Sequence, residues 1–273
     1  MVPIRYWCMR LLRRRLPQGL VEKMLDLGVF LQPGLDTRAP AQSVRLLGEA
    51  CARHGLSLEG ARVCVVGYGG SFGIGLALLD AGARHVVLQD PFAPLRRARI
   101  RQLDAERLRR YFVRRDGAWH PDPARITIER RRLEELAREQ PGQMDVVFSS
   151  SVLEHVDNVE TLVGACAQIV RPGGLNLHAI DLRDHYFRYP FEMLCYSRQT
   201  WEEWLNTSNL NRWRYGDYRR AFERYFNRCD TIVTEALPAE FARTKARIRP
   251  EFLTGDDTVD NVGTIRIEAR RVA

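Results

Sequence analysis

The 273-residue sequence is 45% hydrophobic and 28% charged, with a net charge of +8. This composition excludes a disordered chain, and the length suits one α/β domain with additions. No apolar run reaches the roughly 18 residues of a membrane-spanning helix, and the arginine-broken start lacks the apolar core of a signal peptide, so we expect a cytoplasmic protein.

Two features of the composition bear on partners and metals. Among the 42 basic residues, only Lys23 and Lys245 are lysines. Such arginine bias is typical of GC-rich coding, so solvated arginine faces are favoured over a surface for an anionic partner, and no nucleic acid partner is expected. The six cysteines form no C-x-x-C pair and no zinc-ligand spacing with histidine, which predicts buried free thiols in a reducing compartment and no metal site.

Residues 1–58 are expected to form a helical N-terminal cap or extension. The pattern predicts helices over 5–15, 18–27 and 40–54, with Pro33 and Gly34 interrupting them. The first helix, within 4–16, is basic and carries Trp7. Three roles are considered for it, in this order: capping a pocket, forming a homodimer contact, or making a weak contact with an anionic membrane surface.

Residues 59–273 alternate between predicted strands and helices. The apolar run 62–67, closed by a glycine, indicates a strand buried on both faces. Further strands are expected at 85–89, 125–129, 144–149 and 175–180, and helices at 72–81, 94–113, 133–139 and 159–170. A helix at 215–226 is followed by strands at 229–235 and 264–269, which could pair antiparallel. This order predicts an α/β fold with a doubly wound, mostly parallel seven-stranded sheet, and the aromatic-rich stretch around 183–214 is expected to be a substrate cap inserted after strand five.

The first expected strand leads into a glycine-rich turn, G-Y-G-G-S-F-G. Glycines at 67, 69 and 70 let the backbone turn sharply and approach a ligand closely, and the start of the next helix favours an anionic group. Asp90 ends the second strand, about 20 residues on, where an acid receives ribose hydroxyls. A dinucleotide fingerprint would need a third glycine at the position of Phe72, so a nicotinamide enzyme is disfavoured. The remaining alternative is a glycine turn that binds nothing.

A second motif runs from Met144 to Leu182 and contains V-L-E-H-V at 152–156 and R-P-G-G at 171–174. Over residues 60–182 the chain resembles the class I S-adenosylmethionine-dependent methyltransferases, of a bacterial type associated with small molecules and glycans. The resemblance implies a Rossmann-like fold and S-adenosylmethionine as cofactor. It implies cofactor binding by the following residues: Gly67, Tyr68, Gly69, Ser71, Asp90, Pro91, Ser150 and Ser151. Two positions depart from the family pattern, because Val65 and Arg132 stand where many members carry acids.

Three residues after strands four and five are candidates for catalysis. His185 is the first choice for a general base, and Asp181 or Asp184 could orient it or bind substrate hydroxyls. His155 also lies beside the expected cofactor, but a Glu-His pair there often only caps and packs the next helix. His178 alternates with apolar residues inside a strand and is expected to be a structural core histidine.

Four residues are candidates for binding the acceptor: Arg183, Tyr186, Arg212 and Tyr215. Arginine binds carboxylate or phosphate groups, and aromatic rings stack on flat substrates. The alternative is that these side chains only pack the cap.

The sequence therefore predicts O- or N-methylation of a small-molecule or sugar acceptor in a biosynthetic pathway. The departures at Val65 and Arg132 keep open an enzyme that uses S-adenosylmethionine without methylating, by cyclising it or transferring its aminocarboxypropyl part. An RNA methyltransferase is a third alternative, suggested only by the net charge.

Overall fold

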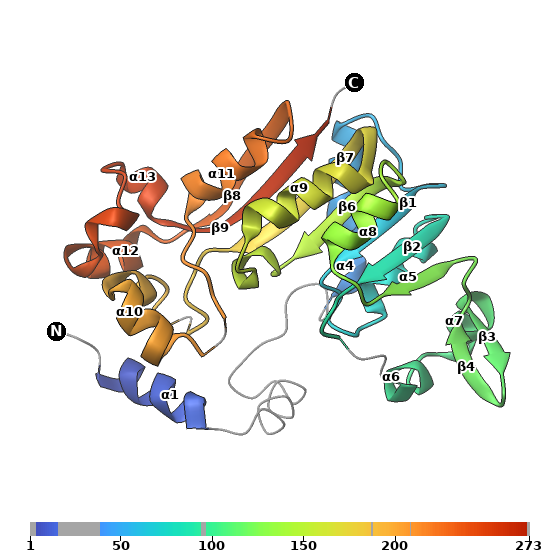
Figure 1. The fold of residues 1–273 in the computed structure, drawn as a ribbon, viewed down its shortest axis with the longest axis horizontal. Coiled ribbons are helices and arrows are strands. Elements are labelled where there is room, and N and C mark those ends of the chain that lie inside the picture. The colour runs from blue at the N-terminus through green and yellow to red at the C-terminus, as the bar shows by residue number, and fades with distance from the viewer. Residues whose placement is uncertain (1–3, 16–38, 94–96, 187, 208, 272–273) are drawn as a thin grey trace.

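The computed structural model describes residues 4–15, 39–93, 97–186, 188–207 and 209–271. Seven strands form one sheet in the order β5-β2-β1-β6-β7-β9-β8 (Figure 1). The strands are β1 (Arg62–Val66), β2 (His85–Gln89), β5 (Ile126–Glu129), β6 (Met144–Ser150), β7 (Val170–Asp181), β8 (Arg228–Ala236) and β9 (Val262–Arg270). The pairs from β5 to β7 are parallel, and β9 runs antiparallel between β7 and β8. The expected seven-stranded, mostly parallel sheet is confirmed, including the antiparallel pair.

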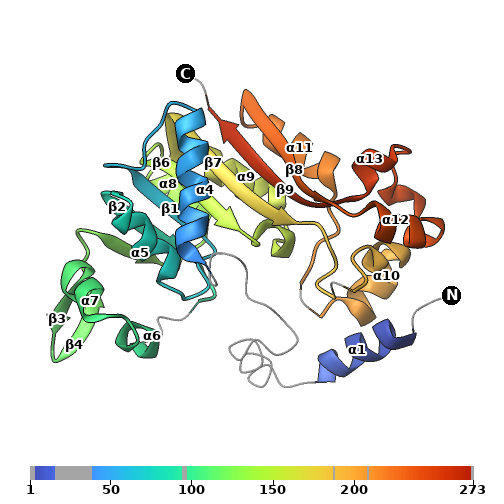
Figure 2. The ribbon, with the colours of Figure 1, turned by 180° about the vertical axis from the view of Figure 1, so that it is seen from behind.

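Helices cover both faces of this sheet (Figures 1 and 2). On one face lie α4 (Pro40–Arg53) and α5 (Gly73–Asp80), and on the other lie α8 (Leu133–Glu139), α9 (Val159–Ile169) and α11 (Tyr215–Glu223). Successive β1 residues alternate between the two cores, because Val63 and Val65 pack with α4 and α5 whereas Cys64 and Val66 pack on the opposite side. This alternation explains why the strand is apolar at every buried position.

A third apolar cluster forms the cap beyond one end of the sheet. It joins three chain segments: α1 (Ile4–Arg15); the stretch with η2 (Glu192–Cys195), α10 (Arg198–Thr200) and η3 (Trp201–Leu205); and the insertion between β8 and β9 with α12 (Pro238–Thr244), η4 (Lys245–Arg247), η5 (Pro250–Phe252) and α13 (Asp257–Asp260). Tyr6, Trp201 and Phe241 come from the three segments and are all at most 2% exposed. The first 58 residues are thus divided, since α1 belongs to the cap and α4 belongs to the sheet core.

The helix expected over 94–113 is interrupted after Arg101, and its last two residues belong to a strand. The chain instead forms α6 (Arg97–Arg101), α7 (Ala105–Tyr111) and a hairpin of β3 (Phe112–Arg115) and β4 (Ala118–Pro121). The Asp104 carboxylate caps α7 by accepting from the Arg107 amide at 2.8 Å. Asp116 and Gly117 form the hairpin turn at φ 47° and 74°, and Asp-Gly is a strong sequence signal for such a turn.

Three remaining expectations concern the N-terminal segment and the thiols. The expected helix at 18–27 lies outside the described residues. No helix in the described ranges has the length and apolar character to cross a bilayer. All six cysteines are free, but only Cys51, Cys64 and Cys166 are buried, and Cys8 is exposed on α1. The expectation of buried thiols is therefore wrong for Cys8.

Candidate active site

The glycine turn after β1 has the conformation that its sequence predicts. Gly67, Gly69 and Gly70 all adopt positive φ, at 71°, 63° and 75°. A Cβ on Gly67 would lie 2.4 Å from a methyl of Val152, so this glycine lets the loop after β1 touch the loop after β6. A Cβ on Gly69 would meet nothing within 4 Å. The turn is therefore closed on its inner side and open at Gly69, which leaves room for a ligand against the backbone.

Asp90 points at this turn from the end of β2. One carboxylate oxygen accepts from the Gly69 amide at 3.0 Å. The other accepts from the amides of Phe92 and Ala93 at 2.9 and 3.0 Å. Because an ionised carboxylate has about four acceptor sites, these three bonds fix its orientation and leave capacity for a ligand hydroxyl.

The other residues expected to bind the cofactor surround the same turn. Tyr68 is 5% exposed, and its hydroxyl has no hydrogen-bond partner among the described residues. Ser71 accepts from the Gly73 amide at 3.4 Å, and Pro91 is half-buried beside Asp90. Ser150 ends β6, and Ser151 follows it with a φ of 53°. An open backbone cradle, an oriented carboxylate and an unsatisfied hydroxyl together fit an adenosyl amino acid.

Three side chains gather where β6 and β7 end at the same edge of the sheet. The His155 and His185 rings pack edge-on with centroids 4.9 Å apart. Glu154, directly before His155, is 2% exposed. One of its oxygens accepts from the Asp181 amide at 3.4 Å, and the other has no partner in the described part of the chain. The structure therefore brings together His155 and His185, as expected, and adds a buried carboxyl that was not among the expected site residues.

Burial sets the protonation of this cluster. It raises the pKa of the Glu154 carboxyl to about 8, and the nearby Asp181 charge adds to the rise. Burial also lowers the pKa of His185 to about 4, with a further contribution from His155. At neutral pH the cluster therefore presents a protonated acid and an unprotonated imidazole whose nitrogen can accept a proton.

The same cluster is a possible cation site. Glu154, His155 and His185 each offer one ligand atom, and these atoms all lie within 4.8 Å of one another. One carboxylate and two imidazoles suit a divalent transition metal. The spacing rules applied to the sequence suggested no metal site, because His185 is brought to the other two residues only by the fold.

Asp181 and Arg183 are bound mainly to each other. The Asp181 carboxylate accepts from the backbone and guanidinium of Arg183 at 2.8–2.9 Å, and Arg183 also pairs with Glu235 at 2.7 Å. The Asp181 charge raises the pKa of His185 and so favours the protonated imidazole, against the larger lowering by burial. Both residues lie at the expected edge of the sheet, but their contacts hold the start of the cap.

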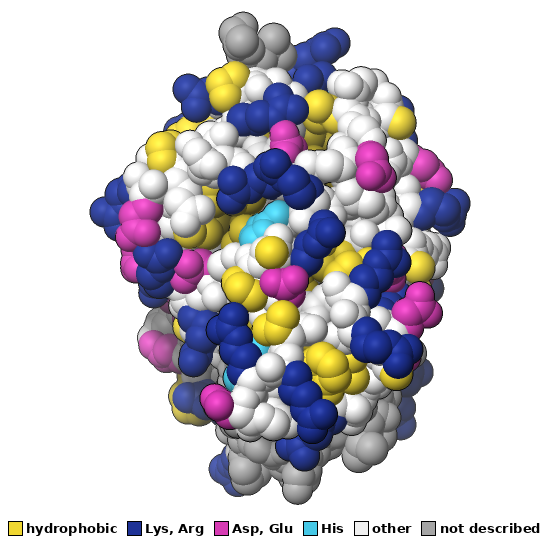
Figure 3. All heavy atoms as spheres, turned by 90° about the vertical axis from the view of Figure 1, so that its right-hand side faces the viewer, with side chains coloured by type: hydrophobic (Ala, Val, Ile, Leu, Met, Phe, Trp, Pro, Cys, Tyr) yellow, Lys and Arg dark blue, Asp and Glu magenta, His cyan; other side chains and the backbone are white. Residues whose placement is uncertain are grey.

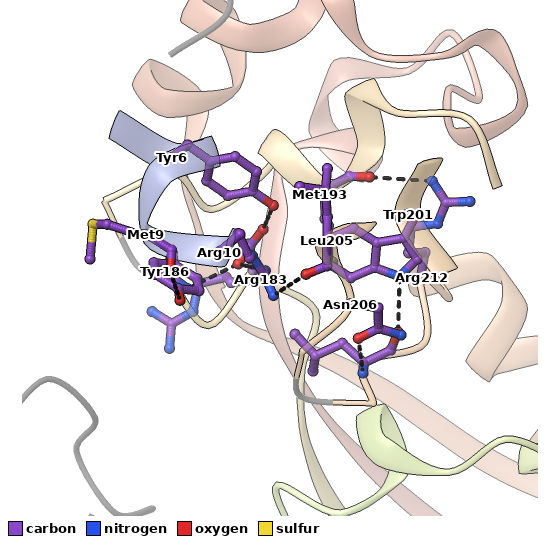
Figure 4. A network of polar contacts seen from close by, with 12 residues as sticks. Tyr6, Met9, Arg10, Arg183, Tyr186, Met193, Trp201, Leu205, Asn206 and Arg212 are labelled. Atoms are coloured by element: carbon purple, nitrogen blue, oxygen red, sulfur yellow. Dashed lines mark hydrogen bonds and ion pairs between the residues drawn. The ribbon is translucent and has the colours of Figure 1, made fainter. Parts of the chain in front are cut away.

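Asp184 is bound by the N-terminal helix and does not orient His185 through any contact described. Its buried carboxylate accepts from the Tyr6 hydroxyl at 2.5 Å and from the Arg10 guanidinium. Figure 4 shows these two side chains reaching the loop from α1, and the Tyr186 hydroxyl donating to the Met9 carbonyl at 3.2 Å. Tyr186, an expected acceptor ligand, therefore also attaches α1 to the cap.

The other two expected acceptor ligands, Arg212 and Tyr215, make hydrogen bonds to backbone carbonyls. The Arg212 guanidinium donates to the carbonyls of Met193 and Tyr196 and stacks over Phe252, which are contacts inside the cap. The Tyr215 hydroxyl reaches the Thr231 carbonyl on β8 at 3.4 Å. These contacts match the packing alternative for Arg212 and Tyr215.

His178 is a core histidine, as expected. It is 0% exposed and its Nδ1 lies 2.7 Å from the Ser149 hydroxyl. Of the two positions that depart from the family pattern, Val65 packs in the sheet core at 3% exposed, and Arg132 lies exposed at the start of α8. Neither supplies a carboxylate for the cofactor.

A family model for a methyltransferase domain matches residues 32–230. The chain belongs to the class I S-adenosylmethionine-dependent methyltransferases. A ubiquinone biosynthesis O-methyltransferase from Leptothrix cholodnii is 30% identical to this methyltransferase over 179 residues, which cover 58% of this chain and 75% of that protein.

Other comparisons agree on the fold. A protein of the same name from Dechloromonas aromatica is 28% identical over 167 residues, covering 58% of this chain and 64% of that protein. The arsenic(III) S-adenosylmethionine methyltransferase of Chlamydomonas reinhardtii superimposes with a TM-score of 0.50 at 16% identity, covering 79% of this methyltransferase and 64% of that chain. The structural likeness supports the sheet and its flanking helices only.

Proposed function

We propose that this methyltransferase uses S-adenosylmethionine to methylate a hydroxyl group of a small molecule. The observation that carries the proposal is the open cradle at Gly69 and Asp90, placed at the same sheet edge as His185. The curated relatives are named O-methyltransferases, which supports oxygen as the acceptor atom rather than nitrogen.

The chain's own residues account for orientation more than for chemistry. S-adenosylmethionine, when bound, supplies a methyl group already activated by the sulfonium. The amides of the turn and the Asp90 carboxylate hold the adenosyl amino acid in place, and such positioning contributes up to roughly 7–11 kcal/mol. The His185 imidazole would take the proton that the acceptor hydroxyl loses, while the cofactor would give up its methyl group and leave as S-adenosylhomocysteine.

The low pKa of His185 restricts how this proton moves. The imidazole is unprotonated at neutral pH, so it is available as an acceptor. A group with a pKa of about 4 is also a weak base, so proton removal must accompany methyl transfer rather than precede it.

The proposal is tested by measuring S-adenosylhomocysteine production with a panel of phenols, catechols, sugars and amines. We expect product only when an acceptor is present, and faster with hydroxyl acceptors than with amines. A cofactor-derived product formed without any acceptor, detected by mass spectrometry, would instead establish the non-methylating alternative.

The RNA alternative finds no support on the face drawn in Figure 3. There, arginine and lysine side chains are interspersed with acidic and apolar ones rather than gathered in one field. Elsewhere many arginines are paired with acids, for example Arg219 with Glu223 and Arg224 with Glu160. RNA binding that falls steeply with added salt would reverse this conclusion.

A further inference from the structure

The N-terminal helix α1 has two faces with different environments. Its inner face buries Tyr6 and Arg10, both 0% exposed, against the cap. The Arg10 guanidinium pairs with Asp184, donates to the Leu205 carbonyl at 3.0 Å and stacks over the Trp201 ring (Figure 4). A helix held by a buried ion pair and ring contacts keeps its orientation, so its opposite face is presented outward.

That outer face carries exposed apolar side chains among exposed arginines. Ile4 is 76% exposed, Leu12 63%, Met9 41% and Leu11 38%. One helix thus carries half of the large hydrophobic side chains that lie exposed in the described structure, in only 12 residues. An exposed apolar face on a helix otherwise fixed in place marks an interaction surface.

The charge of α1 indicates what covers this face. Its sequence, IRYWCMRLLRRR, contains five arginines and no acid. Arg5, Arg14 and Arg15 are exposed, and Arg14 lies over the ring of Trp204, which is itself 53% exposed on the adjoining η3. A second copy of the same helix would bring two sets of arginines together, which disfavours self-association through this face.

We propose that α1 docks on an anionic lipid bilayer. The outer apolar side chains enter the headgroup region, and the exposed arginines bind lipid phosphates. Tryptophan beside them, at Trp204, suits the membrane–water interface. This interaction does not depend on the identity of the acceptor, and it goes beyond the proposed O-methylation.

Docking would also place the active-site loop near the bilayer. Asp184, which anchors Tyr6 and Arg10, directly precedes His185 in the chain. The same helix therefore has one face on the lipid and the other bonded to the loop that carries the candidate base.

Co-sedimentation with vesicles tests the proposal without any activity measurement. The full-length protein is mixed with phosphatidylcholine vesicles, with and without phosphatidylglycerol. We expect binding only to the anionic vesicles, with release by added salt. The paired substitutions Arg5→Gln with Arg15→Gln, and Ile4→Ser with Leu12→Ser, should each weaken binding by about tenfold or more.

Matched controls remove the same side-chain types elsewhere. Arg45→Gln changes an exposed arginine on α4, and Val233→Ser changes an exposed apolar residue on β8. Both should bind vesicles as the unchanged protein does. The proposal is overturned if the unchanged protein ignores anionic vesicles, or if the α1 variants bind as well as the controls. It is also overturned if light scattering shows a dimer that Leu12→Ser separates into monomers.

Discussion

Glu154 is an ionisable side chain that folding removes from water, since it is 2% exposed. Only one of its oxygens has a hydrogen bond within the described residues, and burial raises its pKa from 4.5 to about 8. Between these two values the folded protein holds a proton that the unfolded chain releases, so stability falls as pH rises through this window.

The substitution Glu154→Gln removes this dependence while keeping the shape and the accepting oxygen. As pH rises, we expect the free energy of unfolding of the variant to increase relative to that of the unchanged protein. The difference should reach up to a few kcal/mol at pH 8 and above, because one pKa unit is worth about 1.4 kcal/mol. Urea denaturation at acid and alkaline pH measures the gain. An equal difference between the two proteins at both pH values would contradict a raised pKa.

The second residue-scale prediction concerns His185. We expect His185→Gln to lower kcat by about 10²–10⁴-fold, the usual contribution of a general base. Because the pKa of His185 is about 4, the rate of the unchanged protein should stay level as pH falls from 7 toward 5. An ordinary histidine would instead lose activity below its usual pKa near 6.5.

A chelator distinguishes the base from a metal ligand. If His185 acts as a base, EDTA should leave the rate unchanged. Loss of activity in EDTA that added zinc or magnesium restores would assign Glu154, His155 and His185 to a metal site instead. His178→Gln is not a suitable control, because His178 is buried in the core. His120→Gln is a suitable control, because His120 lies on the β3–β4 hairpin.

Some site residues follow from the sequence because local backbone chemistry requires them. Gly67 and Gly69 need positive φ, and Asp90 occupies the end of a strand next to the glycine turn. Glu154 was missed as a functional residue because the segments that contact it, at Asp181 and Asn211, are distant in the sequence. The packing role of Arg212 was missed for a similar reason. Its guanidinium donates to cap carbonyls, and no local sequence pattern reveals these contacts.

At the scale of elements, one buried ion pair is among the contacts that attach α1 to the cap. Arg10 and Asp184 are both 0% exposed, so replacing Arg10 leaves a carboxylate buried without its partner. Such a loss costs about 3–5 kcal/mol. We expect Arg10→Met to release α1, and hydrogen exchange of the α1 amides to accelerate accordingly.

The control for this change is Arg5→Met, which alters an exposed arginine of the same helix. It should leave the exchange of α1 nearly unchanged. Adding Asp184→Asn to Arg10→Met should recover part of the lost stability, because the unpaired charge is removed. Equal exchange in Arg10→Met and Arg5→Met would show that the ion pair does not hold the helix.

Elements were predicted well where the apolar residues follow one regular pattern through the segment. The five parallel strands and the helices between most of them follow from apolar runs and helical spacing, since each is buried by its immediate neighbours. The cap is different, because its core assembles from three segments separated by nearly the whole chain. The insertion between β8 and β9 carries Phe241 and Ile248 into that core, yet nothing in its own sequence indicates where those side chains pack.

At the scale of the molecule, the cradle, the histidine pair and α1 all lie on the side of the sheet where the parallel strands end. Figure 1 shows α1 and α10 beyond that edge, and the glycine turn lies between β1 and α5. Such an edge is where open parallel sheets bind ligands. The order of strands therefore places the cradle, the histidine pair and the cap together, although they come from distant parts of the sequence.

Calorimetric titration with S-adenosylmethionine tests this account most directly, using the unchanged protein and Gly69→Val. A Cβ at Gly69 meets no described atom within 4 Å, so the valine side chain is expected to extend into the open space of the cradle. The φ of 63° at this position adds some strain, so thermal melting is used to check that the variant is folded. We predict binding to the unchanged protein and loss of that binding in folded Gly69→Val. Undetectable binding to the unchanged protein at millimolar cofactor, or equal binding by both proteins, would contradict the account.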